Sequence, residues 1–105
     1  MVIAVDFDGT LCRSRWPGIG EPNLFLLHDL ANKRKYKTAQ VILWTCREGK
    51  LLEDAVNWCK SYGLEFDAIN DNLPEMIAKY SGSNPRKLHA DLYIDDKSVK
   101  PYWFE

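Results

Sequence analysis

The stretch VIAVDFDGT, residues 2–10, contains four apolar residues followed by two aspartates that flank one phenylalanine. A short continuous apolar run is typical of a strand covered on both faces, as at the centre of a parallel sheet. On an extended backbone, residues i and i+2 project to the same side, so Asp6 and Asp8 are expected to present both carboxylates to one site. Two such carboxylates repel each other unless a cation neutralises one of them or one holds a proton. The stretch therefore predicts a buried strand that ends in a charged site.

Beyond this strand, apolar runs that favour strands alternate with amphipathic stretches that favour helices. The predicted strands are residues 2–5, 39–45, 65–70 and 90–96. The predicted helices are residues 22 to about 37, with Pro22 in the first turn, 51–62, with Gly63 as a left-handed C-terminal cap, and 74 to about 80. Residues 9–21 are predicted to form a loop, and residues 99–105 a fifth short strand or a packed tail. This order indicates one α/β domain, residues 1–105, with an open, mainly parallel sheet and helices on both faces.

Composition excludes several classes of partner. The hydrophobic fraction of 46% is that of a folded globule, and a formal net charge of −1 indicates no long-range attraction to nucleic acid or to an anionic membrane. Cys12, Cys46 and Cys59 match no zinc-binding spacing, which favours free thiols in a reducing cytosol. No run approaches the roughly twenty apolar residues of a membrane span, and no basic leader precedes the first apolar run. We therefore expect a cytoplasmic protein.

Polar side chains follow three of the predicted strands. They are Asp6 with Asp8 after the first, Thr45 after the second, and Asp95 with Asp96 after the fourth. Open α/β sheets bind ligands at the carboxyl ends of their strands, near the point where strand order reverses. Oxygen ligands at this density favour a hard divalent ion, and Mg²⁺ in particular, since it leaves positions for a phosphate oxygen. A phosphate would also need a cationic partner. The candidates are Lys79, Lys87, Arg47 and Arg86.

Three segments resemble motifs of the haloacid dehalogenase-like (HAD) superfamily. DFDGT, residues 6–10, resembles its D-x-D-G-T motif; VILWTCR, residues 41–47, resembles its second motif, which carries a Thr; ADLYIDD, residues 90–96, resembles its acidic fourth motif. The resemblance spans residues 2–96. It implies a three-layer, Rossmann-like fold and a phosphatase that requires Mg²⁺ and hydrolyses phosphomonoesters.

The resemblance also implies roles for the acidic residues. Asp6 would attack the phosphorus and form an aspartyl-phosphate, and Asp8 would protonate the leaving alcohol and then deprotonate the attacking water. Mg²⁺ would bind the carboxylate of Asp6, the backbone carbonyl of Asp8 and Asp95, with Asp96 bound directly or through water.

Phosphate contacts are implied in the same way. Thr45 and the lysine of the third motif would bind the phosphoryl oxygens. Lys87, just before the fourth strand, resembles that lysine more closely than Lys79 does. Gly9, Arg13 and Arg47 border the expected site and are possible substrate contacts, although each arginine is as readily explained by a structural role.

The spacing of the motifs leaves no room for a cap domain, because a loop, a helix and a strand already occupy the chain between Asp8 and Thr45. The chain thus resembles small capless HAD phosphatases of bacterial or phage type. Its site is expected to be open unless residues 13–21 or another subunit of a homo-oligomer covers it. The expected substrate is a phosphorylated small molecule or the phosphorylated end of a macromolecule.

Two other functions remain open. A phosphoacceptor module of the receiver type is also a small α/β domain, but it carries its acceptor aspartate after the third strand, where this chain has Asn70. A catalytically idle HAD-like binding protein is the other alternative, and the intact Asp6, Asp8, Thr45 and Asp95 argue against it.

Overall fold

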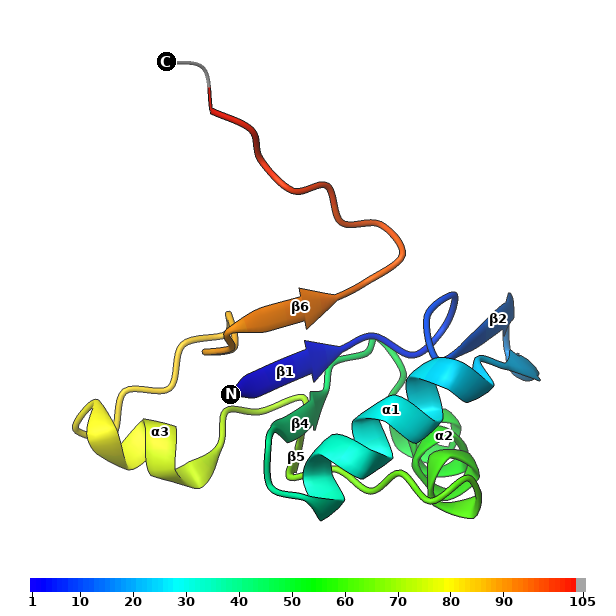
Figure 1. Ribbon diagram of the computed structural model, residues 1–105, viewed down its shortest axis with the longest axis horizontal. Helices are drawn as coiled ribbons and strands as arrows, with labels where there is room; N and C mark the ends of the chain where they lie inside the picture. Colours follow the sequence, from blue (N-terminus) through cyan, green and yellow to red (C-terminus); the bar gives the residue numbers. More distant parts are fainter. Residues whose placement is uncertain (104–105) are drawn as a thin grey trace.

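The computed structural model describes residues 1–103. Its main sheet has four strands in the order β5-β4-β1-β6, and every pairing within it is parallel. The strands are β1 (Val2–Val5), β4 (Gln40–Leu43), β5 (Ala68–Ile69) and β6 (Leu92–Ile94). All four lie within the stretches predicted from sequence, which confirms a small α/β protein with a parallel sheet (Figure 1).

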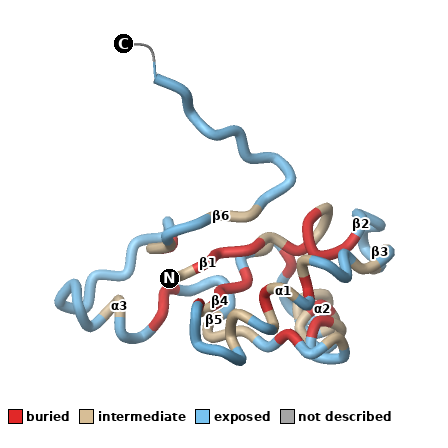
Figure 2. The backbone as a smooth tube through the Cα atoms, viewed as in Figure 1, coloured by how far each residue is buried: buried red, intermediate tan, exposed pale blue. Residues whose placement is uncertain are grey.

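β1 lies at the centre of this sheet and is deeply buried (Figure 2). Ile3, Ala4 and Val5 are at most 1% exposed. Ile3 pairs with Val41 on one side and with Leu92 on the other, so apolar strands flank β1 at both edges. A strand with neighbours on both edges and cores on both faces needs apolar side chains at every position, as the opening run provides.

Three helices cover the two faces unequally. They are α1 (Leu24–Lys35), α2 (Gly49–Ser61) and the shorter α3 (Pro74–Lys79). Ile3 and Val5 share the larger core with residues of α1 and α2, namely Leu27, Leu30, Ala55 and Cys59. Ala4 faces the smaller core with Ile42, Leu73 and Leu88, against which Met76 of α3 packs. Two helices therefore cover one face, and only six residues of helix cover the other.

The predicted helix ends agree with the structure in part. Gly63, directly after the C-cap residue of α2, has a φ of +86°, the left-handed geometry expected of a glycine cap. Pro22 does not begin α1. It ends a strand, and Asn23 is the N-cap, where its side-chain oxygen accepts a hydrogen bond from the Leu26 N–H at 3.2 Å.

The predicted loop at residues 9–21 is wrong for most of its length. The chain forms an antiparallel hairpin of β2 (Cys12–Arg15) and β3 (Gly18–Pro22). Three of the four side chains of β2 are polar and exposed, and β3 has two glycines and a single polar side chain, so no apolar alternation marks the strands. Gly20 permits a close approach, because a Cβ there would clash with the backbone carbonyl of Arg13.

The C-terminal segment is not the predicted fifth strand or packed tail over its described part. Residues 97–103 form no strand and leave the domain beyond β6 (Figure 1), and Val99 and Trp103 are 85% and 87% exposed. Residues 104–105, which the same prediction included, lie outside the described residues. Within residues 1–103, the outer edge of β6 has no partner strand. None of the described helices has the length and apolar character needed to cross a membrane.

Candidate active site

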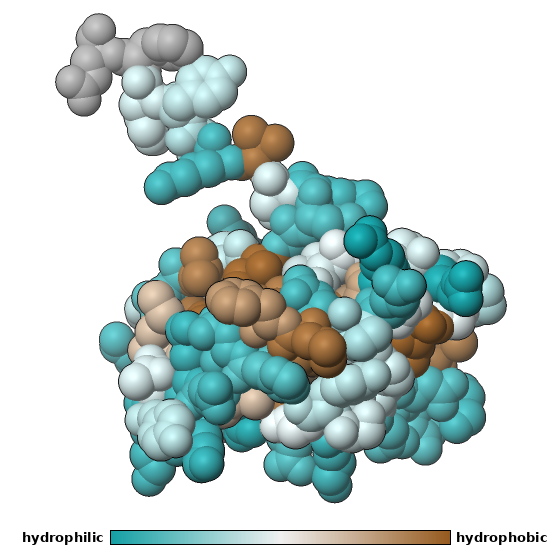
Figure 3. All heavy atoms as spheres, turned by 45° about the vertical axis from the view of Figure 1, so that its right-hand side comes forward, coloured by the Kyte–Doolittle hydropathy of each residue, from teal (hydrophilic) through white to brown (hydrophobic). Residues whose placement is uncertain are grey.

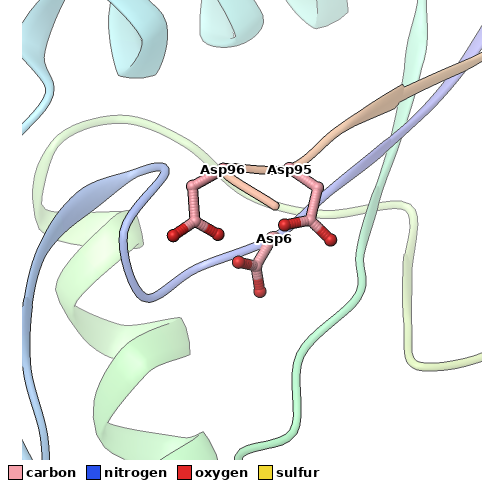
Figure 4. A group of neighbouring side chains, drawn as sticks. All are labelled: Asp6, Asp95 and Asp96. Carbon is pink, nitrogen blue, oxygen red and sulfur yellow. The ribbon is translucent and has the colours of Figure 1, made fainter. Parts of the chain in front are cut away.

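Three carboxylates meet where β1 and β6 end (Figure 4). Asp6 follows β1, Asp95 and Asp96 follow β6, and one oxygen from each lies within 4.8 Å of the others. The chain runs from β1 to β4 and β5 on one side, then returns to place β6 on the other side of β1. The carboxylates therefore occupy the point where strand order reverses, where open α/β sheets bind ligands.

The electrostatics of Asp6 fit a cation site. Burial raises the pKa of Asp6 from 3.8 to about 6; a backbone hydrogen bond from Phe7 opposes this rise, and the charges of Asp95, Asp96 and Asp8 add to it. Ionising Asp6 thus costs more free energy in the protein alone than it does in water. A divalent cation would remove that penalty, and an all-oxygen donor set suits Mg²⁺.

Thr10 ties the two strand ends together. Its side chain is largely buried, and its hydroxyl donates to Asp6 Oδ2 at 3.5 Å and accepts from the Asp96 N–H at 3.1 Å. From the sequence, Thr10 was assigned no role beyond its place in DFDGT. The available signal was its place as the hydroxyl residue that closes DFDGT.

The contact between the turn after β1 and Asp96 requires a glycine at position 9. The φ of Gly9 is +83°, and a Cβ on it would clash with the Asp96 carboxylate. Gly9 was expected as a possible substrate contact, but in the structure its close neighbour is Asp96. The absent side chain lets the end of β6 approach the turn after β1.

Asp8 has a buried partner that the sequence did not predict, Arg47, and it does not line the cavity that Asp6 lines. Both of its carboxylate oxygens accept hydrogen bonds from Arg47, from Nε at 2.9 Å and from Nη2 at 2.8 Å. The prediction assumed extended backbone through Asp8, but β1 ends at Val5 and the chain bends at Phe7. The alternation of side chains is lost at that bend, and Asp8 binds Arg47, although its charge still acts on Asp6.

Arg47 is a structural residue and not the substrate contact considered from sequence. It is 1% exposed, and the hydrogen bond from its side chain to Asp8 raises its pKa. Its guanidinium lies 5.0 Å from the ring centre of Phe7 and 5.1 Å from that of Trp16. It also donates to three backbone carbonyls, those of Pro17, Gly18 and Leu51. Arg47 thereby joins the hairpin and α2 to Asp8.

A cavity of about 1170 Å³ brings the other candidates together, since Asp6, Thr45, Lys87 and Asp95 all line it. The Thr45 N–H donates to Asn70 Oδ1 at 2.8 Å, and Thr45 Oγ1 accepts from the Arg47 N–H at 3.1 Å. These bonds hold Thr45 at the carboxyl end of β4. From the sequence, Asn70 was named only as the residue at the end of the third strand, without this role.

The two lysines that sequence left as alternatives occupy different places. Lys87 lines the cavity, and its ammonium lies 5.8 Å from the ring centre of Tyr93. Lys79, at the end of α3, lies over the ring of Tyr80 at 5.7 Å and does not line this cavity. Arg13, in β2, pairs with Glu21 at 3.6 Å where both side chains are more than 80% exposed, and it also lies outside the cavity lining.

Fold and site together define a small α/β protein with a carboxylate cluster at the switch point of a parallel sheet. Comparison with known proteins found no matching family model and no matching curated protein. A solved structure of a conserved protein from Bacteroides thetaiotaomicron is similar to this chain, with 47% sequence identity and a TM-score of 0.81. The match covers 98% of this chain and 83% of that chain. The chain belongs to the family of that conserved protein.

Proposed function

We propose that this protein is a phosphomonoester hydrolase that depends on Mg²⁺, with a capless, three-layer HAD-like fold and Asp6 as its nucleophile. The observation that carries the proposal is the convergence of Asp6 and Asp95 with Thr45 and Lys87 on one cavity. The cavity thus combines acidic groups suited to a metal with a hydroxyl and an ammonium suited to phosphoryl oxygens.

The metal would be held by Asp6, Asp95 and Asp96, whose oxygens are close enough to share one ion. When bound, Mg²⁺ would neutralise the carboxylates and the phosphate, so that an anionic nucleophile can approach an anionic substrate.

The residues of the chain account for both chemical steps. An oxygen of Asp6 attacks phosphorus, the ester P–O bond breaks, and its electron pair leaves with the alcohol oxygen, which takes the proton held by Asp8. Water then gives a proton to Asp8 and attacks the phosphorus of the aspartyl-phosphate, the bond to Asp6 breaks, and the Asp6 carboxylate and inorganic phosphate are released. Thr45 and Lys87 bind the phosphoryl oxygens in both steps and orient the phosphorus toward Asp6.

The contacts of Asp8 with Arg47 limit how Asp8 can act in this mechanism. It is the proposed general acid and base, yet Arg47 binds both of its oxygens. Asp8 therefore protonates the leaving group only after its carboxylate turns away from Arg47. The proposal thus requires a rotation of Asp8 when substrate binds.

Hydrolysis is tested by incubating the purified protein with p-nitrophenyl phosphate, nucleotides and sugar phosphates, with Mg²⁺ and with EDTA. We expect turnover that needs Mg²⁺ and is lost in Asp6→Asn, whereas Glu53→Gln, an exposed change on α2, retains it. Absence of metal-dependent turnover on every substrate, or full turnover in Asp6→Asn, contradicts the proposal. Stable phosphorylation by acetyl phosphate without turnover favours the receiver-like alternative. If neither phosphorylation nor turnover is observed, an idle binding protein is favoured.

A further inference from the structure

Trp44 is an exposed aromatic residue at the end of a buried strand. It is 40% exposed, whereas Ile42 and Leu43, just before it, are fully buried. The Trp44 N–H donates to the Val5 carbonyl at 2.8 Å, so the extended pairing with β1 continues to this residue. Because side chains alternate along a strand, Trp44 lies on the face of Ile42, the face that only α3 covers.

The cover on that face stops short of the carboxyl ends of the strands. Met76 of α3 and Val2, at the amino end of β1, line a neighbouring cavity of about 530 Å³ that shares Tyr93 and Lys87 with the cavity of Asp6 but does not include Trp44. Beyond α3, the rings of Trp44 and Tyr93 contact each other with centres 5.7 Å apart. Figure 3 shows hydrophobic surface on the body of the domain beside the base of the C-terminal tail.

This aromatic pair adjoins the groups proposed to bind phosphate. Trp44 directly precedes Thr45, and the ammonium of Lys87 lies 5.8 Å from the ring centre of Tyr93. Trp44, Tyr93, Thr45, Lys87 and Asp6 all line the same cavity of about 1170 Å³. The cavity therefore has a polar end suited to a phosphate and an aromatic wall beside it.

Residues at the base of the C-terminal tail also border this cavity. Val99, Lys100 and Pro101 line the same cavity, which is far larger than a phosphate group needs. Pockets that bind organic ligands combine apolar and aromatic walls with a few polar groups that fix orientation. A flat ring gains both burial and stacking against indole, whereas a saturated group of similar size gains burial alone.

We propose that the cavity selects phosphomonoesters whose leaving group carries a planar aromatic ring, with the ring stacked on Trp44 and the phosphate at Asp6, Thr45 and Lys87. This inference rests on the proposed hydrolase function and names its substrate class. Trp44 is the specificity-determining residue, and it takes no part in either bond-breaking step.

Turnover of two matched substrates measures this selectivity. In 2-phenylethyl phosphate and 2-cyclohexylethyl phosphate, the ester oxygen is attached to the same ethyl spacer, and only the distal ring differs. We expect the wild type to favour the phenyl substrate in kcat/KM, and Trp44→Ala to reduce that preference about threefold to tenfold, the range of aromatic contacts. Trp44→Phe should retain most of the preference. Phe25→Ala, which removes an aromatic residue 84% exposed on α1, should leave it unchanged.

Binding without turnover separates this inference from the proposed function. The wild type and Trp44→Ala, each with Mg²⁺, are titrated calorimetrically with 2-phenylethylphosphonate and 2-cyclohexylethylphosphonate, whose C–P bonds are not hydrolysed. Tighter binding of the phenyl compound that depends on Trp44 supports the inference even if no substrate is hydrolysed. Turnover of both esters with equal preference, unchanged by Trp44→Ala, overturns the inference and leaves the hydrolase function intact. If the protein neither hydrolyses the esters nor binds the phosphonates, both the inference and the proposed function are overturned.

Discussion

Arg47 binds both carboxylate oxygens of Asp8, at 2.8 and 2.9 Å, from a position that is 1% exposed. A guanidinium can be buried in this way only when its donors are paired, and the remaining bonds go to carbonyls of the hairpin and of α2. The same residue therefore stabilises the fold and determines where the proposed general acid rests.

Arg47→Ala should destabilise the protein by about 3 kcal/mol, because removing one partner of a buried pair leaves the other partner without compensation. Urea unfolding monitored by circular dichroism measures the change. Arg13→Ala is the matched control, because it breaks an exposed pair in the same hairpin, and it should cost less than about 1 kcal/mol. Equal losses in the two variants would show that the Arg47–Asp8 pair contributes nothing beyond a surface contact.

Gly9→Ala should weaken Mg²⁺ binding about tenfold or more, because the added Cβ clashes with the Asp96 carboxylate. Calorimetric titration with MgCl₂ measures the affinity. Gly82→Ala is the control, since Gly82 has a similar φ of +85° and open space where its Cβ would lie. Both variants should lose stability from backbone strain, but only Gly9→Ala should lose affinity. Equal Mg²⁺ affinity in the two would contradict the assigned role of Gly9.

The raised pKa of Asp6 predicts a pH dependence of stability without metal. The carboxyl has a pKa of about 6 in the folded protein and an ordinary value of 3.8, so between these pH values the unfolded chain binds fewer protons. Stability should therefore fall as pH rises from about 4 to 6, and Asp6→Asn should reduce that fall. Thermal melts across this range measure it. Mg²⁺ should raise the melting temperature most at the upper end, where Asp6 is ionised. Identical pH profiles of stability for the wild type and Asp6→Asn would show that Asp6 does not cause the fall in stability.

Asp67 should behave in the opposite way. Burial raises its pKa, but the hydrogen bonds from Arg34 at 3.0 Å and from the Val41 N–H at 2.7 Å outweigh burial and lower the pKa overall. Its contribution to stability should be present above its ordinary pKa and be lost as pH falls through its lowered folded value. Asp67→Asn should thus cost about 1–3 kcal/mol at pH 7 and less in acid, as measured by urea unfolding. A cost that does not change with pH would contradict this assignment.

The sheet could be predicted from sequence because its signals are local. Four apolar runs separated by helical periodicity specify the strands, and the carboxyl ends of parallel strands must meet at one edge. Asp6, Asp95 and Asp96 follow such strands, so their convergence depends only on strand order.

The position of Asp8 could not be predicted in this way, because it depends on a bend at Phe7 and on a buried partner 39 residues later. The hairpin of β2 and β3 gave no pattern because its outward side chains are polar on both strands. The sequence favoured Lys87 over Lys79 by its place before the fourth strand, but that Lys87 lines the cavity is a tertiary relationship that lysine spacing does not encode.

Trapping the intermediate tests the nucleophilic role of Asp6 most directly. Borohydride reduces an aspartyl-phosphate to homoserine, so protein that is turning over p-nitrophenyl phosphate with Mg²⁺ is quenched with borohydride, digested with trypsin and sequenced by mass spectrometry. The account predicts homoserine at position 6 in the peptide of residues 1–13, dependent on substrate and Mg²⁺. Turnover with no modification at position 6, or with homoserine at position 8 instead, would contradict it.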